Sequence, residues 1–185
     1  MSTTPARVTM VCTGNICRSP AMHYLAKREW RDAAEVTSAG IYAEIGMDVP
    51  SPMRRAAERH SLTIPRHRPT QLDRGILSRA DLVLVATQQH ARWIEQEWGS
   101  AAPHVFVIKE AAELSRTADA PAGSSPAARL AAAAASLHQA RTVTPVALRS
   151  LDDPWARDQA TYDRVMDEIV DDLAELTAWA GLARA

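Results

Sequence analysis

Short apolar runs recur along this chain, separated by segments whose apolar residues repeat at helical spacing. The run DLVLVAT (81–87) is continuous and rich in β-branched residues, as is typical of a strand buried on both faces of a parallel sheet. Strands are predicted over 7–12, 36–39, 81–87 and 104–108. Helices are predicted after Ser19-Pro20 and over 51–60, 88–98, 127–138 and about 159–180. This alternation favours an α/β fold with a parallel sheet.

Capping residues mark the helix ends. Ser19-Pro20 and Ser51-Pro52 each combine an N-cap side chain with a proline at the first helical position. Thr87 predicts the N-cap of the helix over 88–98, and Gly99 predicts its end. Three helices therefore have start signals that are independent of their apolar pattern.

The C-terminal half contains a long segment of biased composition. Residues 115–125 are rich in Ala, Pro, Gly and Ser and predict a mobile loop, and five consecutive alanines support the helix that follows. The last predicted helix gathers apolar side chains on one face: Tyr162, Val165, Met166, Ile169, Leu173 and Leu176. Its acidic residues, including Asp171 and Asp172, are expected on the solvated face.

Length, charge and cysteine content narrow the class of protein. The 185 residues fit one domain, 1–185, and the formal net charge of −1 gives no general reason to expect nucleic-acid or membrane partners. The N-terminus shows no signal-peptide pattern and no run is long enough to span a bilayer, so a cytoplasmic protein is expected. Two cysteines and six scattered histidines predict neither a disulfide scaffold nor a metal site, and no cofactor is expected.

The segment CTGNICRS (12–19) lies between the first predicted strand and the first predicted helix. Open α/β sheets bind ligands at such junctions, and a loop that leads into a helix directs several backbone N–H groups at one point. Gly14 and Asn15 tolerate left-handed backbone angles, and Arg18 offers a planar fork of donors that suits phosphate oxygens. The segment therefore predicts an anion site formed by Thr13, Gly14, Asn15, Ile16, Cys17 and Arg18.

Cys12 places a thiol in this positively polarised loop. A helix N-terminus and an arginine both favour the thiolate, and the Ser19 hydroxyl is placed to donate a hydrogen bond to it. These residues predict phosphoryl transfer to sulfur followed by hydrolysis of a phosphocysteine. The plainer alternative is that Cys12 is a buried residue at a strand end; the complete eight-residue string in this context favours the catalytic interpretation.

A leaving-group oxygen needs a proton, and Asp153 is the best candidate for the general acid. A residue before proline is biased toward extended backbone, so Asp153 in the sequence DDPW is expected to project from a loop. Trp155 is placed to flank an aromatic substrate ring. Taken without the cysteine loop, the same residues would be read as an ordinary acidic turn.

These motifs resemble the low-molecular-weight protein tyrosine phosphatase family, whose broader membership includes related arsenate reductases. The string VCTGNICRSP is close to the family signature, and Asp153-Pro154 followed by an aromatic residue is similar to its general-acid loop. The segments TSAG (37–40), IG (45–46) and HR…QL (67–72) match further family segments in the same order.

The resemblance implies a three-layer fold of the flavodoxin-like, phosphotyrosine phosphatase I-like type, with a four-stranded parallel sheet flanked by helices and no metal. It also implies that Asn15, Ser19, Ser38 and His67 form the network that shapes the phosphate loop, and that Tyr42 takes the place of an aromatic wall. The chain departs from the family at Ala156, where many members carry an aromatic or polar residue. The segment at about 110–151 is also longer than in compact members.

Several interpretations stay open at this point. The substrate is a phosphotyrosine protein or a phosphorylated small molecule; an arsenate reductase that uses an external thiol and a non-catalytic phosphate-binding module are the alternatives. Cys17 either forms a reversible disulfide with Cys12 or packs beneath the loop. The oligomeric state is not predicted.

Overall fold

The computed structural model describes residues 4–99 and 102–182, and its centre is a four-stranded parallel sheet. The strand order is β2-β1-β3-β4. The strands are β1 (Ala6–Cys12), β2 (Ala34–Gly40), β3 (Leu82–Val85) and β4 (Val105–Val107). All three pairings are parallel, which confirms the predicted α/β class and four-stranded sheet.

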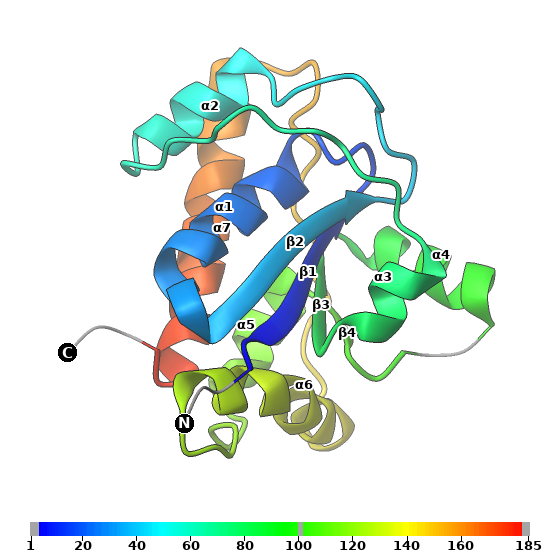
Figure 1. Ribbon diagram of the computed structural model, residues 1–185, viewed down its shortest axis with the longest axis vertical. Coiled ribbons are helices and arrows are strands. Elements are labelled where there is room, and N and C mark those ends of the chain that lie inside the picture. Colours follow the sequence, from blue (N-terminus) through cyan, green and yellow to red (C-terminus); the bar gives the residue numbers. More distant parts are fainter. Residues whose placement is uncertain (1–3, 100–101, 183–185) are drawn as a thin grey trace.

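Helices cover both faces of the sheet, which gives three layers (Figure 1). The helices are α1 (Arg18–Trp30), α2 (Ser51–Glu58), α3 (Arg74–Arg79), α4 (Gln88–Trp98), α5 (Ile108–Ser115), α6 (Pro126–Val143) and α7 (Gln159–Trp179), with a 3-10 turn at Arg31–Ala33. Helices α1, α5, α6 and α7 pack on one face, and α3 and α4 pack on the other. The sequence pattern predicted neither α3 nor α5.

Neighbouring residues of one strand contribute to different cores. Met10 belongs to the larger cluster under α1 and α7, whereas Val11 belongs to the smaller cluster under α3 and α4. Leu84 and Val85 divide between the two clusters in the same way. Because successive side chains of a strand point to opposite faces, a strand covered on both faces must be apolar throughout.

The helix signals were correct in some positions and wrong in others. Thr87 caps α4 by accepting a hydrogen bond from the His90 backbone N–H, and Gly99 ends that helix with φ of 73°. Helix α1, however, begins at Arg18, so Ser19 lies inside its first turn and is not an N-cap. Ser51 is also the first residue of α2, and its side chain caps nothing. Both serines were predicted as N-caps on the assumption that the proline after each is the first helical residue. In the structure α1 starts at Arg18 and α2 at Ser51, so each serine already belongs to its helix.

The apolar face predicted for α7 is buried in full, which confirms the helical register. Asp171 is exposed, as expected, but Asp172 is not. The Asp172 carboxylate lies 3.7 Å from the Lys109 ammonium, and burial raises its pKa to about 6. The expectation of a solvated side chain was therefore wrong for Asp172.

The described residues contain no helix with both the length and the apolar character needed to cross a bilayer. Within the same ranges, no three His, Cys, Asp or Glu side chains lie together in an arrangement that could hold a metal ion.

Candidate active site

The loop after β1 is held against the sheet by its carbonyl groups. The backbone N–H groups of Ile41, Tyr42 and Glu44 donate to the carbonyls of residues 12, 13 and 14 at 3.0, 3.0 and 2.9 Å. Within 4–99 and 102–182, no hydrogen bond uses the N–H of Gly14, Ile16 or Cys17. The loop therefore keeps donors free at the N-terminus of α1, which favours an anion there.

Asn15 supports this loop from inside the protein. Its backbone is left-handed, with φ of 56°, and its side chain is fully buried. The Asn15 Nδ2 group donates to Ser19 Oγ at 2.8 Å, and its Oδ1 accepts from the Thr70 N–H at 2.9 Å and lies 3.3 Å from His67 Nε2. The Asn15 side chain thus braces the loop and does not point toward an anion.

The Ser19 hydroxyl lies 3.0 Å from the Cys12 sulfur. Because Ser19 Oγ accepts from Asn15, its own hydrogen is free to be donated, and the sulfur is nearer than its other acceptor, the Ala39 carbonyl at 3.5 Å. The hydroxyl that looked like a helix cap thus faces the thiol.

His67 and Ser38 have different surroundings, although both were expected to support the loop. His67 lies between Asn15 and the Tyr24 hydroxyl, which is 3.2 Å from its Nδ1, and burial lowers its pKa. A neutral His67 that donates from Nε2 satisfies Asn15 Oδ1. Ser38 instead pairs with His23 Nδ1 at 3.2 Å, and among the described residues no hydrogen bond joins the Ser38 side chain to Asn15, Ser19 or His67.

Arg18 is buried, with its guanidinium directed at the site. One terminal nitrogen, Nη2, lies 2.8 Å from Asp153 Oδ2, and Nη1 donates to the Leu151 carbonyl at 3.4 Å. The Arg18 Nε group is buried and has no hydrogen-bond partner among the described residues. An unpaired buried donor is costly, so this nitrogen is available to an incoming acceptor.

Asp153 lies on a loop, as the sequence predicted, and its side chain is 56% exposed. Its Oδ1 accepts a hydrogen bond from the Trp155 N–H at 3.1 Å, while Oδ2 faces Arg18. A pocket of about 90 Å³ brings together residues far apart in sequence: Cys12, Thr13, Gly14, Ile16, Cys17, Arg18, Glu44, Asp153 and Trp155.

Tyr42 is not among the residues that line this pocket. Its hydroxyl accepts a hydrogen bond from Trp93 Nε1 at 2.8 Å, and the two rings meet edge to face at 5.6 Å. Tyr42 therefore lies outside this pocket with its ring packed on α4, and its role as a substrate wall stays a prediction. Glu44 occupies the rim instead, and no sequence signal indicated it.

Sequence reasoning also missed His90, which is buried beneath the phosphate loop. Its Nδ1 accepts from the Thr87 N–H at 3.1 Å, so its hydrogen is on Nε2, which donates to Thr13 Oγ1 at 2.9 Å. Burial, followed by the Arg18 charge, lowers the pKa of His90 to about 4. The capping position Thr87 was the only available hint, since His90 is the third residue of that helix.

Cys17 is buried beneath the loop and is reduced, as is Cys12. Burial is the main cause that raises the pKa of the Cys17 thiol to about 12, and the Cys12 and Asp153 charges add to the shift. Cys17 is therefore protonated at neutral pH, and only Cys12 lies beside the Ser19 hydroxyl.

The chain is similar to known low molecular weight phosphatases. The family model for low molecular weight phosphotyrosine protein phosphatase matches residues 7–123. The chain is 35% identical over 99 residues to a low molecular weight protein-tyrosine-phosphatase, Ptp, of Acinetobacter johnsonii, covering 54% of this chain and 69% of that one. It is also 35% identical over 108 residues to a protein-arginine-phosphatase of Bacillus subtilis, covering 56% and 70%.

Solved structures show the same fold over nearly the whole chain. The YwlE arginine phosphatase of Geobacillus stearothermophilus matches with a TM-score of 0.70 and 22% identity, covering 94% of this chain and 92% of that one. The tyrosine phosphatase AmsI of Erwinia amylovora matches with a TM-score of 0.70 and 18% identity, covering 97% and 95%.

The fold and the cysteine loop thus define a cysteine-based phosphatase. This chain belongs to the low molecular weight phosphotyrosine protein phosphatase family. The segment matched by the family model ends before Asp153, so the match does not cover that residue.

Proposed function

We propose that this protein hydrolyses phosphotyrosine in proteins or peptides, with Cys12 as nucleophile, Arg18 as phosphate clamp and Asp153 as general acid and base. The observation that carries the proposal is the convergence of these three side chains on one pocket beneath free loop N–H groups. Thr13, Gly14, Ile16 and Cys17 line that pocket, and in this mechanism their backbone surrounds the phosphoryl oxygens.

In the first step the Cys12 thiolate attacks phosphorus, a phosphorus–sulfur bond forms, and the bond to the leaving oxygen breaks. Asp153 donates its proton to that oxygen. In the second step Asp153 takes a proton from water, the resulting hydroxide attacks phosphorus, and the phosphorus–sulfur bond breaks. Phosphate leaves, and the thiolate again accepts the Ser19 hydrogen bond.

The Arg18–Asp153 ion pair fits the substrate-free state of this cycle. A phosphoryl dianion offers oxygens to both Arg18 Nε, which has no partner, and Nη2, which Asp153 now occupies. Substrate binding would therefore draw the guanidinium away from Asp153, and the released carboxylate would take a proton from solvent before it protonates the leaving oxygen.

Two apolar side chains at the pocket support an aromatic leaving group. Ile16 and Trp155 both line the pocket, and Trp155 is 46% exposed, so a phenyl ring can cover apolar surface there. Phosphoarginine in proteins is a second candidate substrate, because the Glu44 carboxylate at the rim would suit a guanidinium group. The Bacillus subtilis relative is named for that activity.

The proposed setting is a single domain in the cytoplasm. The described residues share one sheet with helical layers on both faces, which supports one domain over 1–185. A cysteine nucleophile needs a reducing compartment to remain a thiolate, which supports the cytoplasm.

The test is hydrolysis of para-nitrophenyl phosphate by wild type, Cys12→Ser and Cys17→Ser, with a chelator present. Turnover is expected in wild type and Cys17→Ser and is expected to be undetectable in folded Cys12→Ser. Acid quenching during turnover should trap phosphate on the wild-type protein. Activity in Cys12→Ser would overturn the assignment of the nucleophile, and a folded, reduced wild type without turnover would overturn the proposed function and direct attention to arsenate reduction.

Substrate class is tested by comparing phosphotyrosine and phosphoarginine peptides of the same sequence. Preference for phosphotyrosine that survives Glu44→Gln supports the aromatic pocket. A preference for phosphoarginine that is lost in Glu44→Gln would favour the second candidate.

A further inference from the structure

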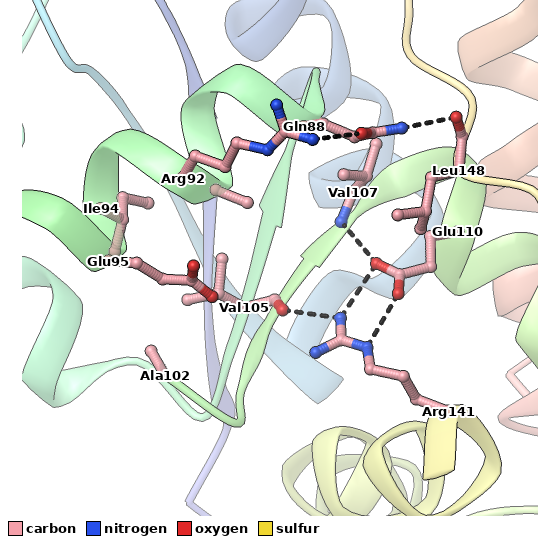
Figure 2. Close-up of a pocket in the computed structure, with 11 residues that line it drawn as sticks. Gln88, Arg92, Ile94, Glu95, Ala102, Val105, Val107, Glu110, Arg141 and Leu148 are labelled. Atoms are coloured by element: carbon pink, nitrogen blue, oxygen red, sulfur yellow. Dashed lines mark hydrogen bonds and ion pairs between the residues drawn. The ribbon is translucent and has the colours of Figure 1, made fainter. Parts of the chain in front are cut away.

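The segment that connects α6 to Asp153 runs over the protein surface, where Val146 packs against the larger core and Arg149 lies 3.5 Å from Glu113. Residues 144–150 have no regular secondary structure, and most of their side chains are exposed. Before this segment, Arg141 in α6 pairs with Glu110 at 2.8 Å and donates to the Val105 carbonyl at 2.9 Å (Figure 2). The position of the segment beyond that anchor depends on its remaining contacts.

Gln88, the first residue of α4, makes two of these contacts. Its backbone N–H donates to Ser150 Oγ at 3.1 Å, and its side-chain Nε2 donates to the Leu148 carbonyl. Figure 2 shows the Gln88 amide between Leu148 and Arg92, whose Nη2 donates to Gln88 Oε1 at 3.4 Å. The Gln88 amide thus accepts a hydrogen bond from Arg92 through its oxygen and donates one to the connecting segment through its nitrogen.

The residues just after Ser150 lead directly to the acid. The Leu151 N–H donates to the Ala86 carbonyl at 3.0 Å, and the Leu151 carbonyl accepts from Arg18 Nη1. Asp153 follows two residues later, its carboxylate contacts Arg18 and the Trp155 N–H, and the neighbouring Asp152 pairs with Arg164 at 2.9 Å. The backbone at 148–151 leads into these contacts and, together with them, sets where the Asp153 carboxylate lies.

We propose that Gln88 is a positioning residue for Asp153, acting through its hydrogen bonds to the connecting segment. This inference rests on the proposed role of Asp153 as general acid. Gln88 lines the neighbouring pocket of Figure 2, not the pocket that contains Cys12, Arg18 and Asp153, and it touches no reacting group, so it is not a catalytic residue. Loss of the Leu148 bond would let 148–151 shift and would misplace the proton donor, while Cys12 and the phosphate loop stay in position.

The measurement compares kcat/KM, which reports the steps through phosphoryl transfer to Cys12, for phenyl phosphate and 2,4-dinitrophenyl phosphate. The leaving group of phenyl phosphate needs the proton, whereas that of dinitrophenyl phosphate leaves readily without it. Gln88→Ala is expected to lower kcat/KM for phenyl phosphate roughly 5- to 10-fold, as the loss of one useful hydrogen bond implies, and to lower kcat/KM for dinitrophenyl phosphate less than about 2-fold. Ser150→Ala, which removes the second bond, should show the same pattern. Inhibition by inorganic phosphate should not change in either variant, and Gln89→Ala, which removes the neighbouring exposed glutamine of α4, is the control with unchanged kcat/KM for both substrates.

Asp153→Asn separates failure of this inference from failure of the proposed function. If Asp153→Asn slows phenyl phosphate selectively and Gln88→Ala adds nothing in that background, Gln88 acts through Asp153. Equal slowing of both substrates by Gln88→Ala, or a full additional loss in the Asp153→Asn background, would overturn the role of Gln88 alone. If Asp153→Asn itself shows no leaving-group dependence, the proposed acid is wrong and the inference about Gln88 is overturned with it.

Discussion

Gly40 lies where β2 passes closest to the phosphate loop, and an alanine there would strike the loop backbone. A Cβ built on Gly40 would lie 2.4 Å from the Thr13 carbonyl oxygen and 3.0 Å from both the Asn15 nitrogen and the Gly14 carbonyl carbon. Ordinary contact begins at 3.4 Å, so the loop would have to retreat by about 1 Å. No side chain can rotate away to relieve this contact, because every atom that it meets belongs to the backbone.

The size of the effect follows from that displacement. Overpacking of this kind costs about 1–3 kcal/mol in the free energy of unfolding. Misplacing catalytic groups by about 1 Å can cost roughly 100-fold in rate. We therefore expect Gly40→Ala to fold, to lose about 1–3 kcal/mol of stability, and to lose roughly 100-fold in kcat/KM.

The assays are urea unfolding and hydrolysis of para-nitrophenyl phosphate. Gly75→Ala is the matched control, because the closest atom to its added Cβ is the end of the flexible Arg79 side chain at 2.9 Å. Gly75→Ala should stay within about 0.5 kcal/mol of wild type and keep full activity. A Gly40→Ala protein with kcat/KM within threefold of wild type would refute the claim that the β2 backbone sets the loop position.

Three further predictions concern the loop and the buried titrating groups. Asn15→Gly and Asn15→Ala should both reduce activity by removing the buried amide, but the alanine variant should be less stable by about 1 kcal/mol because φ is 56°; equal urea midpoints would argue against backbone strain. His90 has a pKa of about 4 in the native state, so the unfolded chain binds its proton first and stability falls as pH drops from 6.5 to 4. His90→Asn should reduce that fall between pH 7 and 5, and an unchanged slope would contradict it. Burial raises the pKa of Asp172 to about 6 in the native state, so its ionisation lowers the free energy of unfolding as pH rises from about 4 to 6. Asp172→Asn should therefore gain stability relative to wild type between pH 4.5 and 7.5. A difference in the free energy of unfolding between variant and wild type that does not change with pH would exclude this linkage.

Local patterns in the sequence determined much of the scaffold. The continuous apolar strands, the buried face of α7 and the Thr87 and Gly99 signals of α4 were all predicted correctly. Each depends on residues within a few positions of one another, where backbone geometry fixes which side chains share a face. The junction of β1 and α1 likewise placed Cys12 and Arg18 in one loop, because both lie within seven residues.

Helix α5 shows where local patterns fail. The run HVFVI (104–108) predicted one strand, but β4 ends at Val107 and α5 starts at Ile108 without an intervening loop. The Glu110 carboxylate, which is also paired with Arg141, accepts from the Val107 N–H at 3.3 Å and satisfies the helix start. Arg141 is 31 residues away in sequence, so the local pattern could not indicate this start.

The working arrangement of the site was decided by tertiary structure. Ser19 carries a good capping signal, yet its hydroxyl faces the Cys12 sulfur because α1 starts one residue earlier. Glu44 lines the pocket and Tyr42 does not, because the Tyr42 ring packs edge to face against Trp93 on α4. The sequence by itself was enough to predict which residues would carry the chemistry and which strand and helix hold them. Only the packed fold decided which side chains reach them, because contacts such as Arg18 with Leu151, separated by 133 residues, depend on how whole layers pack and not on the spacing of neighbours.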